Sequence, residues 1–272
     1  MSLAAPIFFG AVGSPDHAAS ALAPVSAAAR TVTIAVPGAP AKEDVDVRTS
    51  DSLELRGTFY APKRKKNDST PAPGVLLVHD AGGDRAQLEE VALKLQKSGF
   101  GVLSIDLRGH GESKDKAGTW DELDDDQRSR AWALATRDVE AAGEWLLSKE
   151  DVHSTNLSLV GLGSGCALAV RHAKRDENVR CVVLLAPNNK KDFGFDVASD
   201  LLKLEGLPTL VLAEKDDDDT KAMVAEANDG TSPYVELAYA AARVANVIED
   251  RKMPGKVSTW MKGNAMPKRG RS

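Results

Sequence analysis

Hydrophobic and polar residues follow two different patterns along this chain. Between Thr31 and Pro62, short β-branched segments alternate with a period of two and are separated by turns, which predicts antiparallel strands. From Gly74 onward, continuous apolar runs alternate with amphipathic segments of helical period. The sequence therefore predicts an α/β fold, a doubly wound and mostly parallel sheet of about eight strands, with antiparallel N-terminal strands and helices on both faces.

The stretch between Pro187 and Gly206 limits what can cover the ends of these strands. It has room for one short helix, around Phe195 to Leu204. A large cap domain is therefore not expected, and any pocket above the strand ends should be shallow or open.

Both ends of the chain differ in composition from the middle. Residues 1–42 are rich in Ala, Pro and Ser and are predicted to form a tail or linker, in which 31–36 is a candidate added strand. Residues 43–262 carry the α/β pattern and are predicted to form one domain, followed by a basic tail, 263–272. The apolar patch 3–12 resembles a trimmed signal peptide and favours an exported or periplasmic protein, but no basic segment precedes it, so a cytoplasmic location stays open.

Composition and charge exclude several classes of partner. The 272 residues are 42% hydrophobic and 28% charged with a net charge of −5, which suits one globular domain and gives no basic surface for nucleic acid. The apolar runs are too short to span a membrane. The two cysteines, Cys166 and Cys181, lack metal-ligand spacing and are predicted to be buried, so no metal or other cofactor is expected. The oligomeric state is left open.

The stretch from Leu157 to Ala169, LSLVGLGSGCALA, is an apolar strand that breaks into three alternating glycines and continues as a helix-like segment. This is the form of a nucleophile elbow, G-x-S-x-G, in which a strand turns sharply into a helix and presents a reactive serine. The glycines of the motif are Gly161 and Gly165, so the seat of the nucleophile is position 163. That residue is Gly163, which has no side chain to react.

Two further motifs precede the elbow in the chain. GVLLVHDAGG is a strand that ends in a glycine loop, and SIDLRGHGES is a strand followed by a D-x-R-G-x-G-x-S loop, which Asp106 and Arg108 are expected to hold in place. Together with the elbow, these motifs resemble the α/β-hydrolase superfamily, especially its small esterases and dienelactone hydrolases. The resemblance runs from about Glu43 to Lys262 and implies a catalytic triad of serine, acid and histidine.

The triad that this resemblance implies is incomplete, because Gly163 replaces the nucleophile. Asp216, after the strand LPTLVLAEKD, stands at the position of the acid, although the acidic run 216–219 is equally typical of a solvated loop or a weak site for a hard cation. Arg243 stands near the expected histidine, and no histidine follows His172. Arginine stays protonated and cannot act as a general base.

The resemblance also assigns an oxyanion hole, made of backbone N–H groups from the loop His79–Gly83 and from Ser164. The candidate residues in the loop are Asp80 and Ala81. Asp80 departs from the family pattern, because a carboxylate beside a developing oxyanion opposes its charge. Since the N–H groups and Arg243 favour negative charge, the expected ligand of this crevice is a small carboxylate or phosphate.

Three functions fit these observations. The first is a non-catalytic protein that keeps the hydrolase scaffold and binds a small ligand or a partner. The second is an ester hydrolase with Ser164 as its nucleophile, but that shifted frame puts Leu162 and Cys166 where the turn needs glycine, and Ser164 is also explained as the N-cap of the next helix. The third is a protein-interaction scaffold.

Overall fold

The computed structural model describes residues 42–64, 68–188, 193–204, 206–229, 234–240 and 246–266, which contain one eight-stranded sheet in the order β1-β2-β4-β3-β5-β6-β7-β8. The strands are β1 (Lys42–Arg48), β2 (Glu54–Tyr60), β3 (Ala72–Val78), β4 (Gly101–Ile105), β5 (Val152–Leu162), β6 (Val179–Leu185), β7 (Thr209–Ala213) and β8 (Val235–Tyr239). β2 is antiparallel to both of its neighbours, and the other pairs are parallel. The predicted fold class and its antiparallel N-terminal strands are confirmed.

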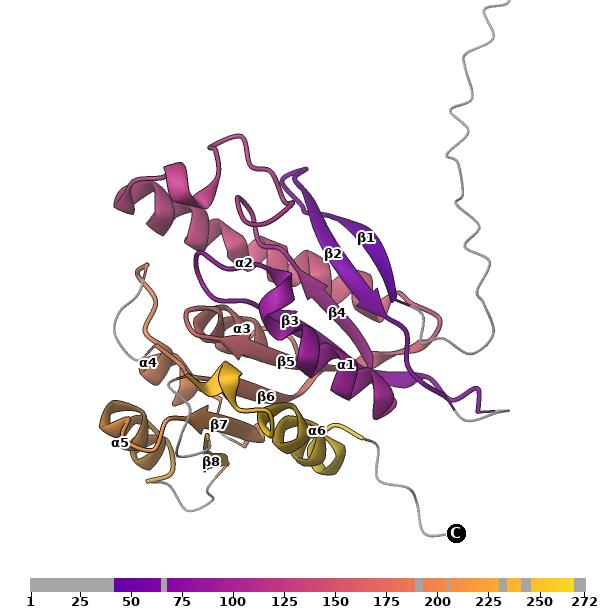
Figure 1. Ribbon diagram of the computed structural model, residues 1–272, viewed down its shortest axis with the longest axis vertical. Coiled ribbons are helices and arrows are strands. Elements are labelled where there is room, and N and C mark those ends of the chain that lie inside the picture. The colour runs from indigo at the N-terminus through magenta and orange to yellow at the C-terminus, as the bar shows by residue number, and fades with distance from the viewer. Residues whose placement is uncertain are drawn as a thin grey trace, which may run out of the picture. The chain divides into compact units, whose positions relative to one another are not determined.

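Helices cover both faces of the sheet (Figure 1). They are α1 (Glu89–Lys97), α2 (Asp125–Leu147), α3 (Gly165–Ala173), α4 (Val197–Leu201), α5 (Asp218–Ala227) and α6 (Met253–Asn264), with 3₁₀ helices at Arg85–Leu88, Trp120–Glu122 and Val247–Glu249. One hydrophobic cluster joins α1 and α6 to the sheet, and a second joins α2, α3, α4 and α5 to the opposite face. Because both faces are covered, the strands β3, β4 and β7 are buried along their whole length and are mostly apolar.

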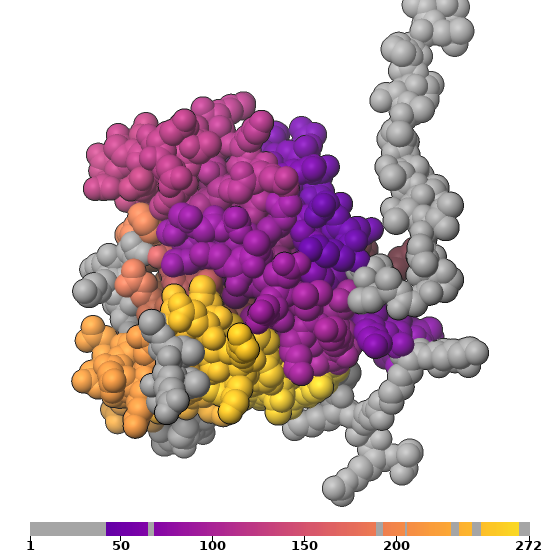
Figure 2. Space-filling view, in the orientation of Figure 1, coloured from indigo at the N-terminus to yellow at the C-terminus, as the bar shows by residue number. Residues whose placement is uncertain are grey.

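The face shown in Figure 2 brings distant parts of the chain into contact, since α1 packs directly beside α6 near the C-terminal end of the domain. The Ser98 hydroxyl at the end of α1 lies 2.7 Å from the Ser258 hydroxyl on α6. Within the described residues, none of the helices has both the length and the apolar character needed to cross a bilayer.

The helix starts follow local capping chemistry. Asp124 accepts the Gln127 N–H at the start of α2, and Asp217 accepts the Thr220 N–H at the start of α5. Ser164 occupies the N-cap position of α3, but its side chain makes no capping hydrogen bond, so the cap expected from the sequence is not formed there.

The structure also sets limits on the predicted tails. β1 begins at Lys42, and α6 continues to Asn264, two residues into the segment expected to be a C-terminal tail. The candidate strand 31–36, with the rest of 1–41, and residues 267–272 lie outside the described residues.

Candidate functional site

The candidate site lies where the order of successive strands in the sheet reverses. β3 leads to β4 on one side, whereas β5 leads to β6 on the other, so the boundary between β3 and β5 is a topological switch point. In open α/β sheets, ligands bind outside the carboxyl ends of the strands at such a point. The residues that follow these two strands are His79 and Asp80 after β3, and Gly163 and Ser164 after β5.

The turn after β5 has the geometry of the elbow in the frame that places position 163 at its tip. Gly163 has φ +54°, in the left-handed region that favours glycine. A Cβ on Gly161 would lie under 3.0 Å from the Cys166 backbone, and one on Gly165 would lie under 3.0 Å from the His79 carbonyl oxygen. The two outer glycines are therefore required by close backbone approach, which disfavours the frame shifted to Ser164.

The two N–H groups assigned to the oxyanion hole converge on one atom of the protein itself. Asp80 Oδ1 accepts hydrogen bonds from the Ser164 N–H at 2.7 Å and from the Ala81 N–H at 2.8 Å. A Cβ on Gly163 would lie under 3.0 Å from all three carboxyl atoms of Asp80. The Asp80 carboxyl group thus occupies both the position predicted for an oxyanion and the space in which a side chain at position 163 would begin.

The backbone of Asp80 is also fixed. Its N–H donates to Gln87 Oε1 at 3.1 Å, and its carbonyl oxygen accepts from the Gly83 N–H at 3.0 Å and from the His79 ring at 2.7 Å. The sequence places Asp80 beside the hole, but it does not indicate that the side chain fills it. The sequence does contain one signal for this contact: an aspartate, Asp80, stands in the loop HDAGG, and position 163 is glycine.

This contact changes the expectation of an external anion. A small carboxylate or phosphate is predicted to bind the N–H groups of Ala81 and Ser164, but in the structure both groups already hold the carboxylate of Asp80. An incoming anion would have to displace that carboxylate and would meet its charge.

His79 and His110, the two histidines of the site, are buried and hydrogen-bonded on both ring nitrogens. His79 Nε2 accepts from the Leu107 N–H at 3.0 Å, and His110 Nε2 accepts from the Gly82 N–H at 3.1 Å, so each proton is on Nδ1, which donates to a carbonyl oxygen. Burial lowers the pKa of His79 to about 3, with a further contribution from His110, and burial also lowers the pKa of His110. Both rings are neutral structural groups that hold loops in place.

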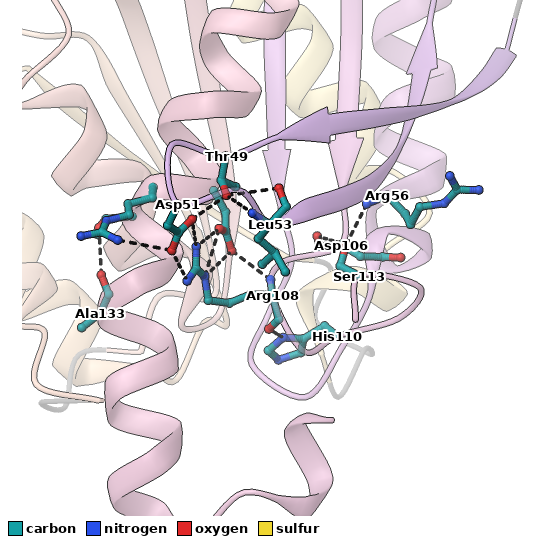
Figure 3. A network of polar contacts seen from close by, with 12 residues as sticks. Thr49, Asp51, Leu53, Arg56, Asp106, Arg108, His110, Ser113 and Ala133 are labelled. Atoms are coloured by element: carbon teal, nitrogen blue, oxygen red, sulfur yellow. Dashed lines mark hydrogen bonds and ion pairs between the residues drawn. The ribbon is translucent and has the colours of Figure 1, made fainter. Parts of the chain in front are cut away.

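The loop after β4 is held by a buried ion network (Figure 3). The Arg108 guanidinium donates to Asp138 Oδ1 at 2.6 Å and to Asp51 Oδ2 at 3.0 Å, which ties the loop to α2 and to the β1–β2 turn. Asp106 accepts the Arg85 N–H at 2.7 Å and the Glu112 N–H at 2.9 Å. Asp106 and Arg108 therefore hold the loop that carries His110, and His110 in turn accepts a hydrogen bond from the Gly82 N–H.

The predicted acid, Asp216, lies in the loop between β7 and α5. Asp216 is exposed and follows β7 by three residues. In the same run, Asp217 caps α5, and Asp218 lies 2.6 Å from Lys221. The described residues bring together no group of three His, Cys, Asp or Glu side chains that could hold a metal ion.

The remaining predicted site residues are Ser164 and Arg243. Ser164 is 6% exposed and has helical dihedral angles, so its hydroxyl is not presented at the tip of the turn. Arg243, together with the rest of 241–245, lies outside the described residues.

Comparison with known proteins agrees with this architecture. The family described as "Alpha/beta hydrolase family" matches residues 75–264. A Bacillus subtilis protein named "Putative hydrolase YtaP" is 28% identical over 151 residues, which cover 48% of this chain and 50% of that protein. The chain therefore spans about half the length of the curated relative that it matches.

Solved structures give the same result at the level of the fold. An esterase from Pyrococcus furiosus is similar with a TM-score of 0.64 and 18% identity, over 84% of this chain and 92% of that one. A dienelactone hydrolase from Anabaena variabilis has a TM-score of 0.62 and 23% identity, over 84% and 99% of the two chains. At these identities the likeness concerns the fold and carries no activity with it.

Proposed function

This chain belongs to the α/β-hydrolase family, and from that premise we propose that it is a non-catalytic member, which uses the switch point for binding instead of hydrolysis. The observation that carries the proposal is the position of Asp80, whose carboxylate accepts both oxyanion-hole N–H groups directly above Gly163.

The chemistry of ester hydrolysis explains why this position matters. An acyl substrate needs a nucleophile near its carbonyl carbon and two N–H donors free to bind the oxyanion that forms. Gly163 supplies no nucleophile, and the donors of Ala81 and Ser164 are already bonded to a carboxylate. A substrate carbonyl would have to replace a charge-assisted hydrogen-bond acceptor that is covalently attached to the same loop.

The rival assignment is an esterase that uses Ser164. Three observations disfavour it: the burial of Ser164, its N-cap position before α3, and the requirement for glycine at positions 161 and 165. A role as an interaction scaffold is compatible with the proposal, since neither needs a nucleophile.

A fluorophosphonate probe tests the proposal on the intact chain, with an active serine esterase of the same fold as the positive control. We expect no covalent adduct on this protein under conditions that label the esterase completely. The matched variant is Ser164→Ala. An adduct on the unmodified chain that disappears in Ser164→Ala would overturn the proposal and establish Ser164 as a nucleophile.

A further inference from the structure

A polar pocket of about 390 Å³ lies at the outer edge of the sheet, beside the hairpin of β1 and β2. Lys42 on β1 lies opposite Tyr60 on β2. Asp44 lies opposite Thr58, two residues along each strand, so all four side chains project from the same face. The pocket is separate from the elbow, because none of the residues 161–165 lines it.

The Tyr60 side chain lines this pocket, and its hydroxyl forms no hydrogen bond with any of the residues that the structure describes. The residue is only 2% exposed, so the ring itself is buried. The charged groups that act on the hydroxyl all line the same pocket, and they are Lys42, Glu89, Arg85 and Asp44. The hydroxyl is therefore directed into the pocket, where a ligand could supply the hydrogen bond that it lacks.

The charged groups around the pocket are mostly acidic. Its lining contains two cations, Lys42 and Arg85, against five carboxylates, which are Asp44, Asp84, Glu89, Asp106 and Glu112. Both cations are already paired, since Lys42 Nζ lies 2.6 Å from Glu89 Oε1 and Arg85 forms ion pairs with Asp106 and Glu112. A ligand would therefore meet an excess of negative charge, which favours a cation.

The carboxylate oxygens that stay free decide which hydrogen bonds a ligand has to supply. Asp84 Oδ1 accepts the Ala86 N–H, and Asp44 Oδ1 accepts the Thr58 hydroxyl. Within the described part of the chain, the second oxygen of each carboxylate accepts no hydrogen bond. Since a carboxylate only accepts hydrogen bonds, the complementary ligand is a donor, and a primary ammonium group combines three N–H donors with a positive charge.

We propose that this pocket binds an aliphatic primary amine in its ammonium form, which the excess of carboxylates attracts and the Tyr60 hydroxyl recognises through a hydrogen bond. The inference goes beyond the proposed function, because it concerns a second place on the molecule. Recognition depends on N–H donors, so a quaternary ammonium ion, which has none, should bind weakly.

Titration of the full chain with propylammonium chloride, followed by the amide NMR signals of Thr58, Tyr60 and Arg85, tests this inference. The comparison ligands are neutral 1-propanol, tetramethylammonium and calcium chloride, all at the same ionic strength. We expect saturable shifts with propylammonium and binding of each comparison ligand that is weaker by at least about tenfold; tenfold corresponds to ~1.4 kcal/mol.

Two variants locate the ligand. Tyr60→Phe removes the hydroxyl and keeps the ring, and Asp84→Asn removes a charge and keeps an oxygen that can accept the Ala86 N–H. Each should weaken the binding of propylammonium severalfold. The matched control is Tyr239→Phe, because Tyr239 is 39% exposed on β8 and does not line the pocket. Urea unfolding of each variant shows whether it is folded.

Four results would overturn the inference: no saturable shift with propylammonium, equal affinity for tetramethylammonium, tighter binding of calcium, or full affinity in folded Tyr60→Phe. All four are separate from labelling by fluorophosphonate, which concerns Ser164 and bears on the non-catalytic assignment alone.

Discussion

Asp80 and Gly163 compete for one volume: the carboxyl group of Asp80 lies where a side chain on Gly163 would begin, and the absence of that side chain lets the carboxylate reach the Ser164 N–H. The two residues are therefore coupled, and a larger side chain at position 163 would displace the carboxyl group of Asp80.

Gly163→Ala should destabilise the protein through two effects. The left-handed φ alone costs a non-glycine residue about 1–3 kcal/mol, and the clash with the Asp80 carboxyl adds to it. Gly194→Ala is the matched control, because Gly194 has φ +80° with no atom within 4 Å of a Cβ. Urea unfolding should give a larger loss of free energy for Gly163→Ala than for Gly194→Ala.

The steric part of that loss should depend on Asp80. The double variant Asp80→Ala/Gly163→Ala should lose less unfolding free energy than the sum of the two single losses, by about 0.5–3 kcal/mol, because the atoms that clash are gone. Additive losses, or equal costs at positions 163 and 194, would show that the carboxyl group does not occupy this space.

His79 should make stability depend on pH. The unfolded imidazole takes up a proton near its ordinary pKa of 6.5, whereas the folded ring has a pKa of about 3, because burial opposes its charge. Its contribution to folding is therefore fully present above pH 6.5 and is lost as the pH falls toward 3. Relative to His79→Gln, the protein should lose about 2 kcal/mol more stability between about pH 7 and pH 5.

The measurement is the free energy of urea unfolding at each pH for both proteins. His110 and His172 also have lowered pKa values, and both are present in the two proteins, so the difference between the profiles reports on His79 and on its interaction with His110. Parallel pH profiles for the two proteins would contradict a buried, neutral His79.

Removal of Arg108 should be severe because Asp138 is fully buried. Arg108→Met leaves that carboxylate without its guanidinium partner, at an expected cost of about 3–5 kcal/mol in unfolding free energy. Asp138→Leu added to Arg108→Met should restore part of this loss. The control is Arg56→Met, which removes an exposed ion pair with Asp46 and should leave the unfolding midpoint nearly unchanged. Equal effects of Arg108→Met and Arg56→Met would refute the importance of the buried network.

The elements of the fold were predictable because they depend on nearby residues. The apolar runs GVLLV and LSLVGL become β3 and β5, and the amphipathic segment after Asp84 becomes α1, as their periods indicate. The side-chain cap expected at Ser164 is not formed: the N–H groups of Cys166 and Ala167 bond to the carbonyl oxygens of Gly163 and Ser164 instead, and Asp80 accepts the N–H of Ser164 itself. The loop-holding role of Arg108 was predictable, but its partners were not, since Asp51 and Asp138 lie 57 and 30 residues away.

The sequence by itself determined the strand and helix order, the sharp turn at Gly161–Gly165 and the lack of a nucleophile at its tip. Each of these follows from residue identity and short-range backbone geometry. Only the tertiary structure decided what the N–H groups of Ala81 and Ser164 bind, because the contact between Asp80 and Ser164 joins residues 84 apart. It exists because β3 and β5 are neighbours in the sheet and because the Asp80 side chain turns inward, and neither property is encoded in the hydrophobic pattern.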